Sequence, residues 1–222
     1  MSESIGADVE SELLRLGGGD PFGDVLVASN KHREGHPGCL LYPAGPRVMS
    51  VATQLVRATR PTRVLDLGSG LGYSTLWLAA AAPPEAMILG IDADEEHCNR
   101  AREFARAHGL EGKTRFVTGE VSTALEAIEG PFDFVHDDAW FALKPPHYER
   151  VLTLLTRHGV LTMPNWFLLE DALTLQPRRD WAEFAGSGWN ESVVQFAAEI
   201  AQDSRLDPVW ITQPPILVAV RR

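Results

Sequence analysis

Several features that would place this sequence in other classes of protein are scarce or absent. Only two cysteines, Cys39 and Cys98, occur in 222 residues, and their wide separation excludes the disulfide framework of a small secreted domain. No apolar run approaches the roughly 20 residues of a membrane-spanning helix, and the segment 1–16 lacks the basic start and apolar centre of a signal peptide. We therefore expect a soluble, cytoplasmic protein with no membrane partner.

Basic residues are also in short supply. The chain has 20 Lys and Arg residues against 30 Asp and Glu residues, which gives a net charge of -10. This balance argues against binding to nucleic acid, and no basic stripe with interleaved aromatic residues accompanies it. The 45% share of hydrophobic residues is enough for a globular core. The length suits one domain, 1–222, in which 1–60 is an N-terminal helical and loop segment and 61–222 is the cofactor-binding core.

Strand-like and helix-like apolar patterns alternate from about residue 63 to the C-terminus, as a parallel α/β sheet requires. The patterns predict strands over 63–67, 87–91, 114–118, 132–137, 159–163, 207–212 and 216–220. They predict helices over 73–82, 94–108, 121–128, 146–156 and most of 177–203. The connection 213–215 is short enough for an antiparallel hairpin. The predicted fold is Rossmann-like: a doubly wound, mostly parallel seven-stranded sheet with an antiparallel C-terminal hairpin.

The region before the first strand has a weaker pattern. Residues 8–16 predict a short helix that ends at consecutive glycines, and residues 46–59 predict a helix with Pro46 in its first turn. Between them, residues 20–45 contain four glycines and three prolines with few periodic apolar positions. That composition predicts an irregular loop.

The segment VLDLGSGLGYST, residues 64–75, carries the clearest chemical signal. A strand runs into a glycine-rich turn and then into a helix, so backbone N–H groups at the start of the helix face a ligand. The dinucleotide pattern G-x-G-x-x-G needs a glycine at position 73, where this sequence has tyrosine. A carboxylate two residues before Gly68, that of Asp66, would repel a pyrophosphate but suits a ligand with an ammonium group. S-adenosylmethionine is such a ligand.

A second carboxylate supports this interpretation. Asp92 ends the second predicted strand, 24 residues after Gly68, where a carboxylate can accept hydrogen bonds from both hydroxyls of a ribose. Asp66 and Asp92 could instead only cap helices. Their placement on consecutive strand ends around a glycine turn favours cofactor binding.

With these motifs the chain resembles the class I S-adenosylmethionine-dependent methyltransferases. Within that class it is similar to the small O-methyltransferases related to catechol and caffeoyl-CoA O-methyltransferases. The resemblance covers about 42–222 and rests on the segments GSGLGYST, IDAD at 91–94, TGEVSTAL at 118–125, FDFVHDDAW at 132–140 and GVLTMPN at 159–165.

The resemblance implies a set of cofactor contacts. Asp66 would take the methionine ammonium group, Tyr73 and Ser74 would lie at the carboxylate end, and Asp92 would hold the ribose. Trp140 would pack on the adenine, unless it is an ordinary core residue. The remaining implied cofactor residues are Tyr42, Ala44, Gly68, Ser69, Gly70, Ala93, Gly119, Glu120, Val121 and Asp138. Because the family commonly forms dimers, the resemblance also implies a homodimer.

The catalytic positions depart from the family pattern, which is Asp-x-Asp-Lys or Asp-His-Trp-Lys followed one strand later by Asp-Asn. In the family the first Asp and the Asp-Asn pair bind a divalent cation, and the lysine is the general base. Here Asp138 and Asn165 occupy the outer metal positions, but Pro164 replaces the middle ligand and Phe141 replaces the lysine. Losing one of two carboxylates removes much of the attraction for a hard cation such as Mg²⁺. We therefore expect an intact cofactor pocket, catalytic residues that differ from those of the family, and no metal requirement.

Several residues could supply the missing base. Lys144 and His147 follow the fourth predicted strand and could approach the site, as could His136, which is otherwise a buried core histidine. His32 and His36 lie in the N-terminal segment, which helps to form the substrate mouth in this family, although a surface position explains them as well. Asp138, Lys144 and His147 are the catalytic candidates.

The predicted function is methyl transfer from S-adenosylmethionine to an oxygen of a small molecule. Trp166, Trp181, Trp189 and Trp210 in the C-terminal half offer surface to an aromatic acceptor, although core packing explains most of them. An N- or C-methyltransferase and a non-catalytic S-adenosylmethionine-binding protein remain open as alternatives. A nicotinamide oxidoreductase is disfavoured by Tyr73 and Asp66.

Overall fold

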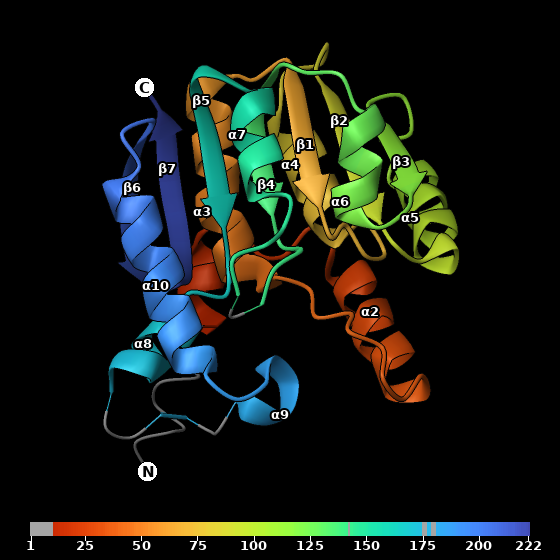
Figure 1. Ribbon diagram of the computed structural model, residues 1–222. Helices are drawn as coiled ribbons and strands as arrows, with labels where there is room; N and C mark the ends of the chain where they lie inside the picture. Colours follow the sequence, from red (N-terminus) through yellow and green to blue (C-terminus); the bar gives the residue numbers. More distant parts are fainter. Residues whose placement is uncertain (1–10, 142, 175–176, 179–180) are drawn as a thin grey trace.

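The computed structural model describes residues 11–141, 143–174, 177–178 and 181–222, and its centre is one seven-stranded sheet (Figure 1). The strand order is β3-β2-β1-β4-β5-β7-β6. The strands are β1 (Arg63–Leu67), β2 (Met87–Asp92), β3 (Thr114–Thr118), β4 (Phe132–Asp137), β5 (Leu155–Met163), β6 (Leu206–Thr212) and β7 (Pro215–Arg221). The predicted Rossmann-like sheet is confirmed.

The pairing of the strands follows the predicted topology. β1 lies between β2 and β4, and the five strands β1 to β5 run parallel to their neighbours in that group. β7 runs antiparallel both to β5 and to β6, so the predicted C-terminal hairpin is present. In β1 the four residues after Arg63 are buried, as a central parallel strand covered on both faces requires.

Two layers of helices cover the sheet (Figure 1). α3 (Gly45–Thr59), α4 (Tyr73–Ala81) and α5 (Glu95–Ala107) pack on one face, in a core that includes Val64 and Phe134. α6 (Val121–Ala124), a 3-10 turn (Leu125–Ala127), α7 (Tyr148–Leu154) and α10 (Trp189–Gln202) pack on the other face, in a core that includes Leu65 and Val135. Neighbouring residues of one strand therefore enter opposite cores, as the alternation of side chains in a strand dictates.

The prediction of an irregular loop over 20–45 was wrong in part, because α2 (Gly23–Gly35) lies within it. Two of the four glycines in this segment, Gly23 and Gly35, lie at the two ends of the helix. Only Val25, Ser29 and His32 of α2 are buried, so the apolar pattern is too weak to indicate a helix. Of the predicted helix 8–16, residues 11–16 are helical, and the rest lie outside the described residues.

The C-terminal half contains two short helices between β5 and α10. α8 (Phe167–Leu173), which the sequence pattern did not predict, follows β5, and α9 (Ala182–Ala185) precedes α10. Gly186 and Gly188, with φ of 82° and 81°, separate α9 from α10. In Figure 1 the arrowheads of β1 and β5 point to the end of the sheet beyond which α2, α8 and α9 lie. No helix in the described part of the chain is both long enough and apolar enough to span a membrane.

Candidate functional site

A cavity of about 1990 Å³ lies at the carboxyl ends of the parallel strands. Its walls include residues at the ends of the five strands β1 to β5 or within two positions after them, namely Gly68, Asp92, Glu120, Asp138 and Pro164. Ligands bind at this end of open α/β sheets because the loops after neighbouring strands converge there. The volume exceeds the roughly 300–1,000 Å³ of common small-molecule pockets. There is room for a cofactor and a second molecule together.

The structure brings most of the predicted site residues to this cavity. Those that line it are Tyr42, Ala44, Gly68, Ser69, Gly70, Tyr73, Ser74, Asp92, Ala93, Glu120, Val121, Asp138, Trp140, His147 and Asn165. Three predicted residues do not line it, namely Asp66, Gly119 and Lys144. Gly119 follows β3, and its N–H donates to the Asp92 carbonyl 2.9 Å away.

The glycine turn after β1 presents backbone rather than side chains to the cavity. Gly68 has φ of 78°, and a Cβ there would lie 3.1 Å from the carbonyl carbon and oxygen of Asp138. A Cβ on Gly70 would lie 2.4 Å from Leu41 Cδ1. The hydroxyl oxygen of Ser69 is buried and has no hydrogen-bond partner among the described residues. The turn thus offers bare backbone and one unused polar atom beside the cavity.

Asp66 lies behind this turn instead of at the cavity wall. Its side chain is fully buried, and Oδ2 accepts hydrogen bonds from Ser74 Oγ at 2.8 Å and Thr75 Oγ1 at 2.5 Å. Oδ1 has no partner in the described residues. Burial raises the pKa of Asp66 to about 6, an effect that the two hydroxyl groups partly oppose. Asp66 can therefore act on a bound cofactor only indirectly, through the backbone of the glycine turn or through the hydroxyl groups of Ser74 and Thr75.

Asp92 at the end of β2 is held by three donors. The N–H of Gly70 donates to Oδ2 at 2.8 Å, which ties the second strand end to the glycine turn. Oδ1 accepts from the Asp94 N–H and from Nδ1 of His97, each 3.0 Å away. The carboxylate is thus fixed in orientation at the cavity wall, while its two oxygens retain capacity for a further donor.

The two remaining residues of the family's metal pattern lie together. Nδ2 of Asn165 lies 2.7 Å from Oδ1 of Asp138. Asn165 has φ of 70°, a left-handed conformation that asparagine tolerates better than most residues. Burial raises the pKa of Asp138 well above its ordinary value, and the Asn165 hydrogen bond only partly opposes this. One carboxylate, one amide and a proline make a poor donor set for Mg²⁺, which prefers six oxygen ligands.

His147 is paired with a carboxylate that the sequence did not single out. Its Nε2 lies 2.9 Å from Oδ2 of Asp137, and the two side chains are only 4% and 1% exposed. Oδ1 of Asp137 accepts the N–H of Ala139 at 3.1 Å. Since an ionised carboxylate can only accept, Nε2 carries the proton and Nδ1 keeps its lone pair. A histidine held in one tautomer lines the cavity.

The other base candidates lie elsewhere. Lys144 is on the surface, where its Nζ lies 3.0 Å from Glu199 Oε2 and 3.4 Å from Glu149 Oε1, so it points to acids of α10 and α7 and not to the cavity. His136 in β4 is fully buried, and Nδ1 lies 2.9 Å from Thr162 Oγ1 in β5. Burial lowers the pKa of His136 to about 4. Neither residue lines the cavity.

Four aromatic side chains that line the cavity form what we call the aromatic wall: Phe141, Phe167, Trp181 and Phe184. The ring of Trp181 lies 5.8 Å from that of Phe141, 5.4 Å from that of Phe167 and 6.4 Å from that of Phe184. Trp140 also lines the cavity and lies 4.7 Å from Trp166 between ring centroids. At position 141, where the family pattern has a charged lysine, this chain therefore has an apolar side chain that forms part of the aromatic wall.

Comparison with known proteins identifies the family. The family model described as O-methyltransferase matches residues 47–222, and the chain belongs to this family. A caffeoyl-CoA O-methyltransferase of Stellaria longipes is 23% identical over 82% of the chain and 76% of the relative. A catechol O-methyltransferase of Niastella koreensis is 30% identical over 64% of each chain. The resemblance noted from the motifs is therefore confirmed.

Solved structures share the fold. A methyltransferase of Podospora anserina, solved with S-adenosylhomocysteine bound, has a TM-score of 0.79 at 19% identity and covers 100% of this chain and 97% of its own. A Streptomyces achromogenes O-methyltransferase of tomaymycin synthesis, solved with S-adenosylmethionine, has a TM-score of 0.68 at 24% identity, over 89% of this chain and 88% of its own.

Proposed function

We propose that the chain transfers a methyl group from S-adenosylmethionine to a hydroxyl oxygen of a small molecule without help from a divalent cation, and that His147 is the general base. The observation that carries the proposal is the His147–Asp137 pair at a cavity whose other walls are the glycine turn and Asp92. Family membership supports the reaction class. The residues of the cavity support the particular mechanism.

The cavity fits the cofactor in three respects. Gly68 and Gly70 line the cavity with backbone alone, so a ligand can approach the turn closely. The unused hydroxyl of Ser69 offers a hydrogen bond. Asp92, fixed by Gly70 and Asp94, offers carboxylate oxygens to ribose hydroxyls. When bound, S-adenosylmethionine would supply an electrophilic methyl group on a sulfonium.

His147 then has a defined task. An acceptor hydroxyl must lose its proton at or near the moment when its oxygen forms the bond to the methyl carbon. Nδ1 of His147 takes that proton, and the Asp137 carboxylate stabilises the resulting imidazolium through its hydrogen bond to Nε2. The turn at Gly68 and Gly70 and the Asp92 carboxylate would hold the cofactor, which would supply the methyl group and be left as a neutral thioether. The other residues of the cavity act by positioning the acceptor oxygen in line with the methyl carbon and the sulfur.

The donor set argues against a magnesium-dependent mechanism. Asp138 accepts the Asn165 amide, Asp137 is committed to His147, and Pro164 has no side-chain oxygen. The family pattern has a divalent cation and a lysine base at these positions. Here we infer that the histidine replaces both the cation and the missing lysine.

The aromatic wall favours an apolar, planar acceptor. Three rings surround Trp181, and aromatic pairs gain about 0.5–1.5 kcal/mol beyond the burial of their area. We also propose that the chain acts as one domain and as a homodimer, on the basis of family habit. Light scattering on the purified protein tests the latter directly.

Transfer of a labelled methyl group tests the proposal. Wild-type protein is incubated with methyl-labelled S-adenosylmethionine and a panel of phenols in chelator, and the products are analysed for methyl ethers. The proposal predicts ether formation that survives chelation and is lost in His147→Gln. Transfer that requires added Mg²⁺, or that His147→Gln leaves unchanged, would overturn it.

A further inference from the structure

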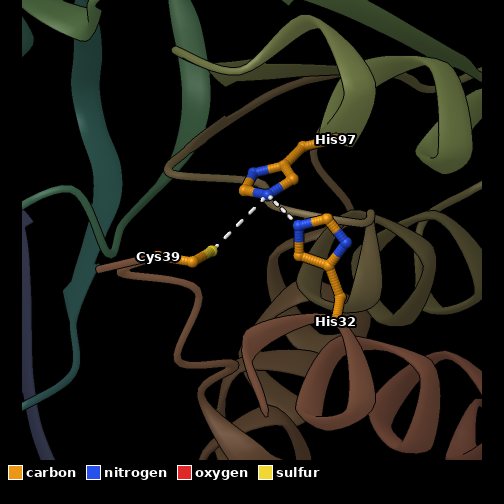
Figure 2. Close-up of side chains that lie close together, drawn as sticks. All are labelled: His32, Cys39 and His97. Atoms are coloured by element: carbon orange, nitrogen blue, oxygen red, sulfur yellow. Dashed lines mark hydrogen bonds between the residues drawn. The ribbon is translucent and has the colours of Figure 1, made fainter. Parts of the chain in front are cut away.

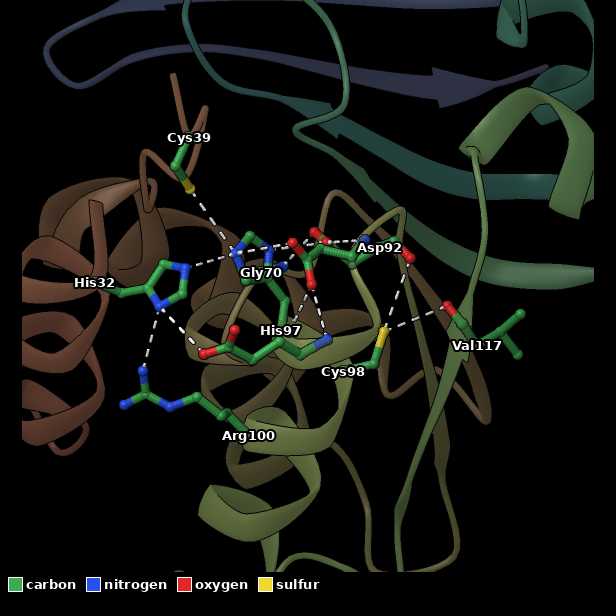
Figure 3. A network of polar contacts seen from close by, with 10 residues as sticks. His32, Cys39, Gly70, Asp92, His97, Cys98, Arg100 and Val117 are labelled. Atoms are coloured by element: carbon green, nitrogen blue, oxygen red, sulfur yellow. Dashed lines mark hydrogen bonds and ion pairs between the residues drawn. The ribbon is translucent and has the colours of Figure 1, made fainter. Parts of the chain in front are cut away.

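Three side chains from separate parts of the chain converge on one point (Figure 2), and Asp92 lies beside them (Figure 3). His32 comes from α2, Cys39 from the loop after α2, and His97 from α5. Nε2 of His97 lies 3.3 Å from Nε2 of His32 and 3.8 Å from Sγ of Cys39. The three potential ligand atoms all lie within 4.8 Å of one another. Within the described chain, no other group of at least three His, Cys, Asp or Glu residues comes this close together.

The separations correspond to the edges of a tetrahedral metal site. Zn²⁺ binds histidine nitrogen at about 2.0–2.1 Å and cysteine sulfur at about 2.3 Å. Tetrahedral angles then place two nitrogens about 3.3 Å apart, and a nitrogen and a sulfur about 3.6 Å apart. Two of the observed separations are 3.3 Å and 3.8 Å, and the third, between His32 and Cys39, lies within 4.8 Å. The first two match a tetrahedral site closely, and a bound cation would draw Cys39 and His32 toward each other.

Without a cation, two side chains compete for one acceptor atom in this cluster. Asp92 accepts from Nδ1 of His97, which leaves Nε2 of His97 with a single lone pair in the ring plane (Figure 3). The His32 Nε2 and the Cys39 thiol both face that one lone pair. A cation at the centre would be bound by all three atoms at once.

The surroundings also favour a cation. Nδ1 of His97 lies 3.0 Å from Oδ1 of Asp92, and a carboxylate in this position fixes the ring of a ligating histidine. Glu96 Oε1 lies 3.7 Å from His32 Nδ1, and Asp94 Oδ2 lies 4.0 Å from His97 Nε2. These acids offset the positive charge of an ion.

We propose that His32, Cys39 and His97 form a Zn²⁺ site that fastens the N-terminal segment to the core beside the cofactor cavity. Two imidazoles and a thiolate suit zinc, whereas Mg²⁺ prefers oxygen ligands. All three residues line the cavity, so the fourth coordination position is open to water or to Asp94. The site is separate from the Asp138–Asn165 position of the family metal, and its formation does not depend on methyl transfer.

Cobalt substitution tests the site without cofactor or acceptor. The metal-free full-length protein is titrated with Co²⁺ and followed by absorption spectroscopy. The proposal predicts a single tight ion per chain, the strong visible bands of tetrahedral cobalt and a sulfur-to-cobalt charge-transfer band. Equimolar Zn²⁺ should abolish all of these features. Cobalt bound with only the weak bands of an oxygen-ligated, octahedral ion would overturn the proposal.

Matched variants identify the ligands. Cys39→Ser should remove the charge-transfer band and weaken Co²⁺ binding at least tenfold, and His97→Gln should weaken it similarly. Cys98→Ser is the control, because Cys98 lies next to His97 in sequence but its Sγ faces the carbonyls of Asp92 and Val117 (Figure 3). The control should keep the band. A band that persists in Cys39→Ser or disappears in Cys98→Ser contradicts the assignment.

Thermal unfolding provides a second readout that is independent of spectroscopy. Zn²⁺ should raise the Tm of wild-type protein and of Cys98→Ser, because it joins α2 and α5 in the folded state alone. It should leave the Tm of Cys39→Ser nearly unchanged. An equal rise in all three proteins would point to binding elsewhere and would overturn the proposal.

Discussion

Nε2 of His147 lies 2.9 Å from Oδ2 of Asp137, although the two residues belong to different segments and both are almost fully buried. Asp137 is the last residue of β4, and His147 immediately precedes α7. The pair adjoins Asp138, whose family role is to bind a cation. The carboxylate of Asp137, next to that metal position, therefore orients the proposed base His147.

The first prediction concerns the base itself. His147→Gln keeps an N–H donor for Asp137 but offers no basic nitrogen, so kcat should fall by about 10²–10⁴-fold. The affinity for S-adenosylhomocysteine should stay within about twofold of wild type. Steady-state kinetics and calorimetry on the same preparation separate the two quantities. A parallel loss of both would indicate that His147 has a structural role.

Asp137→Asn tests the orienting carboxylate. Asparagine can donate to the ring and so allow the wrong tautomer, and it does not stabilise an imidazolium. The value of kcat should fall in steady-state kinetics, whereas the affinity for S-adenosylhomocysteine should stay within about twofold of wild type. An unchanged kcat would argue against coupling between the two residues.

The glycine turn gives a prediction with an internal control. In Gly68→Ala the new Cβ meets the Asp138 backbone at 3.1 Å in a left-handed conformation, so the turn must move. We expect a loss of at least about 1 kcal/mol in the free energy of unfolding and a tenfold or greater loss of S-adenosylhomocysteine affinity. Gly112→Ala, where no atom lies within 4 Å of the new Cβ, should change neither quantity. Equal behaviour of the two variants would contradict the account of the turn.

The buried carboxyl group of Asp66 should make the free energy of unfolding depend on pH. Its pKa is raised from 3.8 to about 6 in the folded protein, so between these values the folded state binds more protons than the unfolded state. The free energy of unfolding should therefore fall as the pH rises from about 4 to about 6, by up to about 3 kcal/mol. Asp66→Asn should remove this slope in denaturant titrations, and the difference between the two proteins isolates the contribution of Asp66. A slope that the variant retains would show that another group causes it.

Restoring the family metal ligand is the fifth prediction. Pro164→Asp would place a second carboxylate beside Asp138 and Asn165, so the variant should bind Mg²⁺ by calorimetry. Wild-type protein should show no comparable heat. Tight Mg²⁺ binding by the wild type would mean that the present donor set is sufficient.

The parts of the site that could be predicted are those encoded by local sequence. Gly68 and Asp92 follow short apolar strands, and strand ends of a parallel sheet meet at one edge, so their proximity follows from the order of elements. The helix α2 escaped prediction because its buried face is small and includes Ser29 and His32, so apolar periodicity does not mark it.

The polar pairs could not be predicted in the same way. Asp137 and Asp138 are adjacent and look equivalent in sequence, but the alternation of side chains sends one to His147 and the other to Asn165. Lys144 and His147 are three residues apart on one connection, and only the packing of that connection decides which faces the cavity. The His32–His97 contact joins positions 65 apart in sequence, and nothing local in either segment indicates it.

The central claim is tested most directly by calorimetric titration of S-adenosylhomocysteine into the wild-type protein in chelator, repeated with excess Mg²⁺. We expect saturable binding of one molecule per chain in chelator, with an affinity that Mg²⁺ does not change. Absence of binding in both conditions would contradict the assignment of the cavity to this cofactor. Binding that appears only with Mg²⁺ would contradict the metal-free site.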